Sequence, residues 1–262
     1  MAKPKIFIGT LHSGESEFDE CCAAIREQEN VDVTHHVISG LHEYEAHNEL
    51  WNAWGKVKTR HHFFVKIDAD TILNRKDALS EIHGLFCQPD VTGVQLKLHD
   101  YFTDDLISGL NSFSTEVVFT GSTQRLYADR ADKNHNIVLK GDIVEHLAPI
   151  GWHCRYPNPR QAFHFGLHRA LKGQSTIIQK CAEKWLEVRD EGRMWALLGA
   201  CAANEKNIKK NHDYHNQNFK DAFDNFFKSS MNLNSVVEKY IESGINVNEI
   251  GVWENIKRWL RR

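Results

Sequence analysis

The chain has 262 residues, of which 41% are hydrophobic and 26% charged, so it can bury a large core. Its formal net charge of -3 disfavours nucleic acid as a partner, because it carries no excess of basic side chains for phosphates. Its six cysteines form no C-x-x-C pair, which disfavours a zinc ribbon and predicts reduced thiols. We expect a cytoplasmic protein, because no apolar stretch is typical of a signal peptide or a membrane span.

The first part of the chain alternates between predicted strands and helices. Strands are expected at 5–10, 31–38 and 63–67, and helices at 18–25 and 45–54. Parallel neighbours need crossover helices, so this alternation predicts an α/β fold of the nucleotide-binding type. We therefore expect a mixed, mostly parallel sheet flanked by helices.

The second part of the chain changes from strands to helices. A helix at 77–86 and a strand at 91–98 precede a polar, aromatic loop at 99–105, where a substrate could be met. Short strands are expected at 116–119, 124–127 and 137–139, followed by an irregular, proline-marked connection at 149–159. Helices then follow from residue 161 onward, including 177–201, 219–227, 233–241 and 252–260. We expect a catalytic domain at 1–175 and a helical region at 176–262.

Two carboxylates, Asp68 and Asp70, follow the apolar run at 63–67. In open α/β sheets the ligand site lies beyond the carboxyl ends of the strands, which is where these residues fall. Two close carboxylates repel each other, and a cation bound to both them and a ligand's oxygens relieves this repulsion. The alternative is a solvated turn, in which Asp is also favoured. A nucleophilic Asp of the haloacid dehalogenase type is disfavoured, because Thr71 follows Asp70 directly.

Two histidines, His164 and His168, stand four residues apart, on one face if their segment is helical. Imidazole binds divalent transition metals, and the neighbouring Arg169 suits phosphate. The alternative is an ordinary helix start with packed aromatic residues. The sequence contains neither G-x-G-x-x-G nor a P-loop, so the charge of a bound nucleotide would have to be met by a metal and by Lys or Arg.

The carboxyl-terminal segment 252–262 is amphipathic, with Trp253, Ile256, Trp259 and Leu260 on one side and basic residues on the other. One interpretation is a helix that lies on the inner face of a membrane and meets a lipid-linked acceptor. The other is a helix packed on the domain.

The order of these elements resembles a known family. From residue 5 to about residue 170, the chain is similar to the nucleotide-sugar half of a family 2-like glycosyltransferase with the glycosyltransferase-A fold, and Asp68-Ala69-Asp70 is the specific motif. The resemblance implies Mn²⁺ or Mg²⁺ held against the diphosphate of a nucleoside-diphosphate-sugar donor. It implies Asp70 as the direct metal ligand, Asp68 on the ribose or a metal-bound water, and His164 as a late metal ligand.

The resemblance also implies residues around the donor and acceptor. Thr10 and Glu15 would lie near the nucleotide base and ribose, and Arg169 would assist the diphosphate. Inverting members use a carboxylate as the base that deprotonates the acceptor. Glu145 is favoured for this role over Asp142, because His146 lies beside it. The family's familiar Glu-Asp pair is absent, so the choice stays open and includes Asp104 and Asp105.

The function that this resemblance implies is a metal-dependent, hexosyltransferase-like glycosyltransferase of polysaccharide biosynthesis. It would move a sugar from a nucleoside-diphosphate sugar to a hydroxyl group on a saccharide or lipid-linked acceptor. Two alternatives stay open: a nucleotidyltransferase on a similar sheet, and a non-catalytic carbohydrate or protein interaction domain. The donor base, the sugar, the acceptor and the stereochemical outcome are not specified by the sequence.

Overall fold

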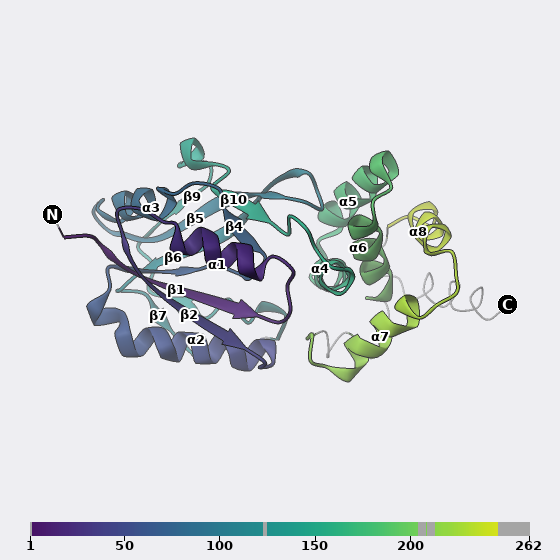
Figure 1. Ribbon diagram of the computed structural model, residues 1–262, viewed down its shortest axis with the longest axis horizontal. Coiled ribbons are helices and arrows are strands. Elements are labelled where there is room, and N and C mark those ends of the chain that lie inside the picture. The colour runs from purple at the N-terminus through teal and green to yellow at the C-terminus, as the bar shows by residue number, and fades with distance from the viewer. Residues whose placement is uncertain (1, 123–124, 204–207, 209–212, 246–262) are drawn as a thin grey trace. The chain divides into compact units, whose positions relative to one another are not determined.

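The structure is a computed structural model that describes residues 2–122, 125–203, 208 and 213–245 (Figure 1). The chain forms two compact units. The first contains Met1–Tyr101 and Asp105–Tyr156, and the second contains Phe102–Asp104 and Pro157–Arg262. This division falls earlier in the chain than the expected one at residue 175.

The first unit is built on a mixed, mainly parallel sheet, as the sequence predicts. Its strand order is β2-β1-β3-β6-β5-β10-β4, and β9 pairs with β5. Strand β1 is parallel to β2 and β3, whereas β6 is antiparallel to β3 and β5. Strand β10 is parallel to β5 and antiparallel to β4. The strands are β1 (Lys5–His12), β2 (Asp32–Ser39), β3 (Phe63–Lys66), β4 (Thr71–Leu73), β5 (Val91–Asp100), β6 (Asp105–Ser114), β9 (Ile137–Lys140) and β10 (Gly151–His153).

Helices cover both faces of this sheet (Figure 1). On one face α1 (Phe18–Arg26) and α3 (Ala78–Phe86) share a core with the alternate β1 residues Ile6 and Ile8. On the other face α2 (Glu43–Val57) packs against Phe7. Strand side chains alternate between the two faces, so β1 contributes to both cores. A small second sheet pairs β7 (Val118–Phe119) with β8 (Asp132–Lys133).

Four sequence predictions differ from the structure. The strand expected at 124–127 is wrong, because Arg125–Tyr127 form a 3-10 helix. The expected loop at 99–105 is reduced to a turn at 101–104, since β5 extends to Asp100 and β6 begins at Asp105. The connection at 149–159 contains β10, which is too short to give a periodic pattern. The single helix expected at 177–201 is two helices, because Arg189 is left-handed and the Asp190 side chain caps the next helix.

The second unit contains the helices α4 (Pro159–Leu171), α5 (Ser175–Val188), α6 (Glu191–Ala202), α7 (Gln217–Phe227) and α8 (Leu233–Glu242). The Asn158 side chain caps the N-terminus of α4 by accepting a hydrogen bond from the Gln161 amide. Phe102 is fully buried and stacks on Phe165 of α4, with ring centroids 3.9 Å apart. Of the helices in the described part of the chain, none is long and apolar enough to cross a membrane. The helix expected at 252–260 lies outside the described residues.

Candidate metal centre

The Asp68-Ala69-Asp70 motif forms a tight turn at the carboxyl end of β3. The turn closes where the Thr71 amide donates a hydrogen bond to the Asp68 carbonyl oxygen, at 2.9 Å, and β4 then begins. The Ile67 amide donates to the Gly9 carbonyl oxygen and so continues the pairing of β1 with β3 up to the turn. The motif therefore lies at the carboxyl ends of two parallel strands, the position at which open α/β sheets bind ligands.

Asp68 is held by a lysine from its own strand. The Lys66 ammonium, whose side chain is only 10% exposed, forms an ion pair with the Asp68 carboxylate, whose side chain is 46% exposed. Burial alone would raise the pKa of Asp68, but the attraction of Lys66 outweighs it and lowers the pKa below its usual value. Asp68 is therefore an anion whose charge is already balanced by a protein cation.

Asp70 has different partners. Its Oδ2 accepts a hydrogen bond from the Cys154 thiol at 3.1 Å and lies 3.7 Å from His153 Nε2. Its Oδ1 is buried and has no hydrogen-bond partner among the residues that the structure describes. A buried carboxylate oxygen without a partner costs free energy unless a cation or a ligand satisfies it. Asp70 is thus the carboxylate of the pair that is ready to bind an ion.

His153 and Cys154 reach Asp70 through strand pairing. His153 is the last residue of β10, which is antiparallel to β4, and lies opposite Thr71; Cys154 follows directly. The Cys154 amide also donates to the Asp70 carbonyl oxygen, at 2.9 Å. Asp70, His153 and Cys154 each place a ligand atom within 4.8 Å of the others, a spacing that could hold a metal ion.

A buried carboxylate orients the His153 ring. Asp100, at the end of β5, is fully buried, and its Oδ1 lies 2.7 Å from His153 Nδ1. A carboxylate accepts a proton from Nδ1, and in the neutral ring this leaves the lone pair on Nε2, the nitrogen nearest to Asp70 and Cys154. This carboxylate-to-histidine arrangement is typical of the residues behind a metal ligand.

Glu15 lies in the loop after β1, and the charge of Asp70 affects its pKa. The Ser13 amide donates to Glu15 Oε2 at 2.6 Å. Burial and the nearby Asp70 carboxylate raise the pKa of Glu15 to about 7. The acidic turn and Glu15 therefore form one electrostatic site, in which additional positive charge would be stabilising.

No protein-family model and no curated protein matches this sequence. Solved structures resemble the chain at low identity. One is the mannosyltransferase PcManGT from Pyrobaculum calidifontis in complex with GDP-Man and Mn²⁺, with 12% identity, a TM-score of 0.41, and 99% of this chain and 85% of that chain covered. Another is a glycosyltransferase involved in the glycosylation of the major capsid of PBCV-1, with 14% identity, a TM-score of 0.31 and 42% of this chain covered. The match spans 60% of that second protein's chain. Both neighbours are glycosyltransferases.

The other residues predicted for the first unit lie outside the metal cluster. Thr10 is fully buried, and its hydroxyl lies 3.0 Å from His35 Nε2, so it links β1 to β2. Asp142 and Glu145 are exposed in the segment between β9 and β10. The expected roles of these three residues with the donor and the acceptor stay predictions.

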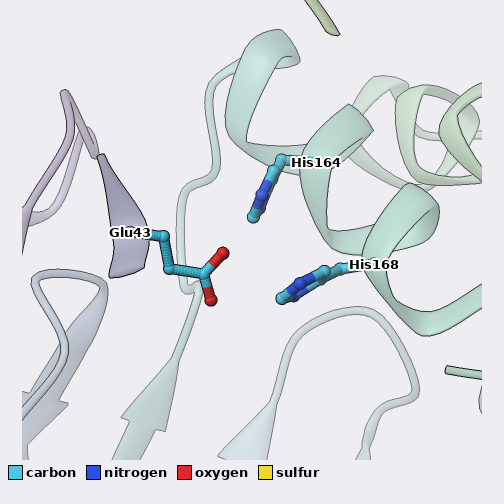
Figure 2. Close-up of side chains that lie close together, drawn as sticks. All are labelled: Glu43, His164 and His168. Carbon is cyan, nitrogen blue, oxygen red and sulfur yellow. The ribbon is translucent and has the colours of Figure 1, made fainter. Parts of the chain in front are cut away.

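The remaining predicted residues belong to α4 of the second unit. His164 and His168 lie on successive turns, with ring centroids 4.9 Å apart (Figure 2). His164 stacks on Tyr214, with centroids 3.9 Å apart, and Arg169 Nη1 donates to Gln174 Oε1 at 3.0 Å. The shared helical face is confirmed. The expected part of His164 in metal binding, and of Arg169 in diphosphate binding, stays a prediction.

Sequence reasoning missed three residues of the cluster: Asp100, His153 and Cys154. The signal that was present was an adjacent histidine and cysteine in a short segment between Gly151 and Pro157. Nothing local links that segment to Asp70, which is 84 residues from Cys154 in the chain, because the link is the pairing of β10 with β4.

Proposed function

We propose that this protein is a metal-dependent glycosyltransferase that moves a sugar from a nucleoside-diphosphate-sugar donor to a hydroxyl acceptor. The observation that supports it is Asp70, whose buried Oδ1 has no hydrogen-bond partner among the described residues and whose Oδ2 lies 3.7 Å from the Nε2 of His153, a histidine oriented by a buried carboxylate. A carboxylate oxygen and an imidazole nitrogen suit a divalent transition metal. The residues therefore fit the ion that the proposal requires.

In this proposal Asp70 and His153 hold the ion, and Asp100 keeps the His153 ring in place. A bound divalent ion stabilises the negative charge that develops on a departing diphosphate. Of the two ions expected from the sequence, Mg²⁺ has the stronger preference for oxygen ligands, so an imidazole ligand favours Mn²⁺ over Mg²⁺. Lys66 keeps Asp68 ionised, and the half-exposed Asp68 carboxylate accepts hydrogen bonds from the donor's ribose or from a metal-bound water.

Glu15 contributes to the donor side of the same site. Because its pKa is about 7, it exchanges a proton near neutral pH, and it can either donate a hydrogen bond to a ribose hydroxyl or accept one from it. Deprotonation of the acceptor by Glu145 or Asp142 is the sequence-based part of the proposal. So are a saccharide or lipid-linked acceptor, a cytoplasmic location and membrane contact through segment 252–262, which lies outside the described residues.

The test is calorimetric binding of UDP, GDP, CDP and dTDP, with and without Mn²⁺, to the wild-type protein and to Asp70→Asn. We expect one nucleotide to bind tightly only in the presence of metal. Losing a charged ligand should lower that affinity at least about tenfold in Asp70→Asn. Asp32→Asn, which changes an exposed carboxylate at the start of β2, is the matched control and should bind as the wild type does.

If no nucleotide binds a folded protein at saturating metal, the transferase proposal is wrong and an interaction domain is favoured. If Asp70→Asn keeps the full metal-dependent affinity, the donor site lies elsewhere. If a nucleotide does bind, its sugar conjugate is tested next. The measurement is transfer of a labelled sugar to saccharide and lipid-linked acceptors.

A further inference from the structure

The three ligand atoms of the cluster have the spacing of one face of a coordination tetrahedron. Asp70 Oδ2 lies 3.1 Å from Cys154 Sγ and 3.7 Å from His153 Nε2, and Cys154 Sγ lies 3.5 Å from His153 Nε2. An ion with tetrahedral bonds of about 2.0–2.3 Å places its ligands roughly 3.3–3.8 Å apart. One ion can therefore reach all three atoms with only small adjustments of the side chains.

The three ligands are a carboxylate, an imidazole and a thiol. Oxygen-preferring ions such as Mg²⁺ and Ca²⁺ gain little from a sulfur ligand, and Mn²⁺ is the weakest binder of the first-row divalent series. Zn²⁺ binds thiolate, imidazole and carboxylate together, and three protein ligands leave a fourth position for water or substrate. Cys154, which is 1% exposed, thus changes which ion the site prefers.

The surrounding backbone holds these ligands before any ion arrives. Asp100 fixes the His153 ring, and the Tyr101 amide donates to the His153 carbonyl oxygen at 3.2 Å. The Cys154 amide bonds to the Asp70 carbonyl oxygen, and Cys154 adopts a left-handed φ of 53°, which is uncommon for a residue other than glycine. This conformation places the thiol beside Asp70 in a preformed site.

We propose that Asp70, His153 and Cys154 form a thiolate-containing site for an ion of the zinc class, with one coordination position left open. The inference names the ion of the proposed donor site, so its role in catalysis rests on the proposed function, whereas ion binding itself does not. On binding, the Cys154 S–H bond breaks, the sulfur's electron pair forms the bond to the metal, and the proton passes to the solvent. Burial and Asp70 hold the pKa of the Cys154 thiol well above its usual range, so the thiol keeps its proton until a cation is present.

The test is titration of the reduced, metal-free protein with Co²⁺ in the absence of nucleotide. We expect one equivalent to bind, with a sulfur-to-cobalt charge-transfer band in the near ultraviolet and the strong visible bands of tetrahedral cobalt. Zn²⁺ should displace the Co²⁺ and should outcompete an equal concentration of Mn²⁺. The wild-type spectrum is decisive by itself, so the test does not depend on any variant being folded.

Variants then assign the ligands. Cys154→Ser should abolish the charge-transfer band and lower Zn²⁺ affinity at least about tenfold, while Cys87→Ser, which changes an exposed cysteine, should leave both unchanged. Asp100→Asn changes a positioning residue, so it should keep the charge-transfer band but lower the affinity by about 10–100-fold. Loss of the band in Cys87→Ser with retention in Cys154→Ser would overturn the assignment.

The outcomes separate this inference from the proposed function. An octahedral cobalt spectrum without a sulfur band would overturn the thiolate site and would leave a transferase with an oxygen-ligated ion intact. Tetrahedral cobalt with a sulfur band, in a protein that binds no nucleoside diphosphate, would support the site and overturn the transferase.

Discussion

Two carboxylates that are separated by one residue in the chain have different surroundings in this protein. Asp68 is paired with Lys66, whereas Asp70 lies against Cys154 and has one buried oxygen without a partner. Both acids belong to the same Asp-Ala-Asp motif, and the sequence alone gives no reason to expect different partners for them. The difference arises from their neighbours, because Lys66 belongs to β3 and Cys154 directly follows β10. We therefore propose Asp70, and not both carboxylates equally, as the residue that binds the ion.

Glu15 gives a pH-dependent prediction at the same scale. Its pKa is about 7 in the folded protein, compared with about 4.3 for a glutamate in an unfolded chain. Between these pH values the folded state holds a proton that the unfolded state has lost, so the free energy of unfolding falls as pH rises. We expect metal-free wild type to lose thermal stability from pH 5 to pH 8 relative to Glu15→Gln, with the two proteins similar near pH 4.

The measurement is thermal unfolding at several pH values with a chelator present. Glu49→Gln, which changes an exposed carboxylate on α2, is the control and should follow the wild-type profile. Parallel profiles for wild type and Glu15→Gln would show that Glu15 ionises normally.

Within the second unit, α4 and α6 approach each other closely where they cross. A Cβ atom added to Gly166 would lie 1.6 Å from the Ala196 carbonyl oxygen, and one added to Gly199 would lie 1.9 Å from the Phe163 carbonyl oxygen. Real Cβ atoms do not come this close to backbone, so any side chain at either position forces the helices apart. Glycine weakens a helix, and here the loss is offset by the close packing that it allows.

We expect Gly166→Ala to lower the free energy of unfolding by about 1–3 kcal/mol or more, because backbone on both helices must move. The measurement is denaturant unfolding followed by circular dichroism. Gly84→Ala is the matched control, since its site on α3 has nothing within 4 Å of the added Cβ, and it should stabilise the protein by about 1 kcal/mol. Equal changes in the free energy of unfolding for the two substitutions would contradict the close approach of α4 and α6.

At the scale of the whole molecule, the second unit is built from two segments that are far apart in the chain. Strands β5 and β6 belong to the first unit, but the turn between them, Phe102–Asp104, belongs to the second. There Phe102 stacks on Phe165, and its carbonyl oxygen accepts a hydrogen bond from Arg193 Nε at 3.0 Å. The second unit is therefore incomplete without a segment that precedes it by more than 50 residues.

We expect Phe102→Ala to destabilise the second unit by about 3–5 kcal/mol, the usual cost of removing a buried phenylalanine side chain. Hydrogen exchange should become faster in α4 and α6, while the amides of β1 and β3 keep their protection. Leu106→Ala removes a side chain that is 40% exposed on β6, and it should leave exchange in α4 and α6 unchanged. Unaltered protection of those helices in Phe102→Ala would mean that the turn is not part of their core.

The sequence by itself determined most of the strands and helices and the acidic pair of the candidate site. Period-2 and helical patterns are local, so the alternation of strands and helices was visible, as was a pair of acids at the end of a buried strand. The tertiary structure alone decided which side chains meet those acids. His153 and Cys154 reach Asp70 because a three-residue strand pairs with β4, and Asp100 reaches His153 because β5 pairs with that same strand. Such pairings join residues tens of positions apart through backbone hydrogen bonds, which any residue but proline can make, so side-chain patterns do not record them.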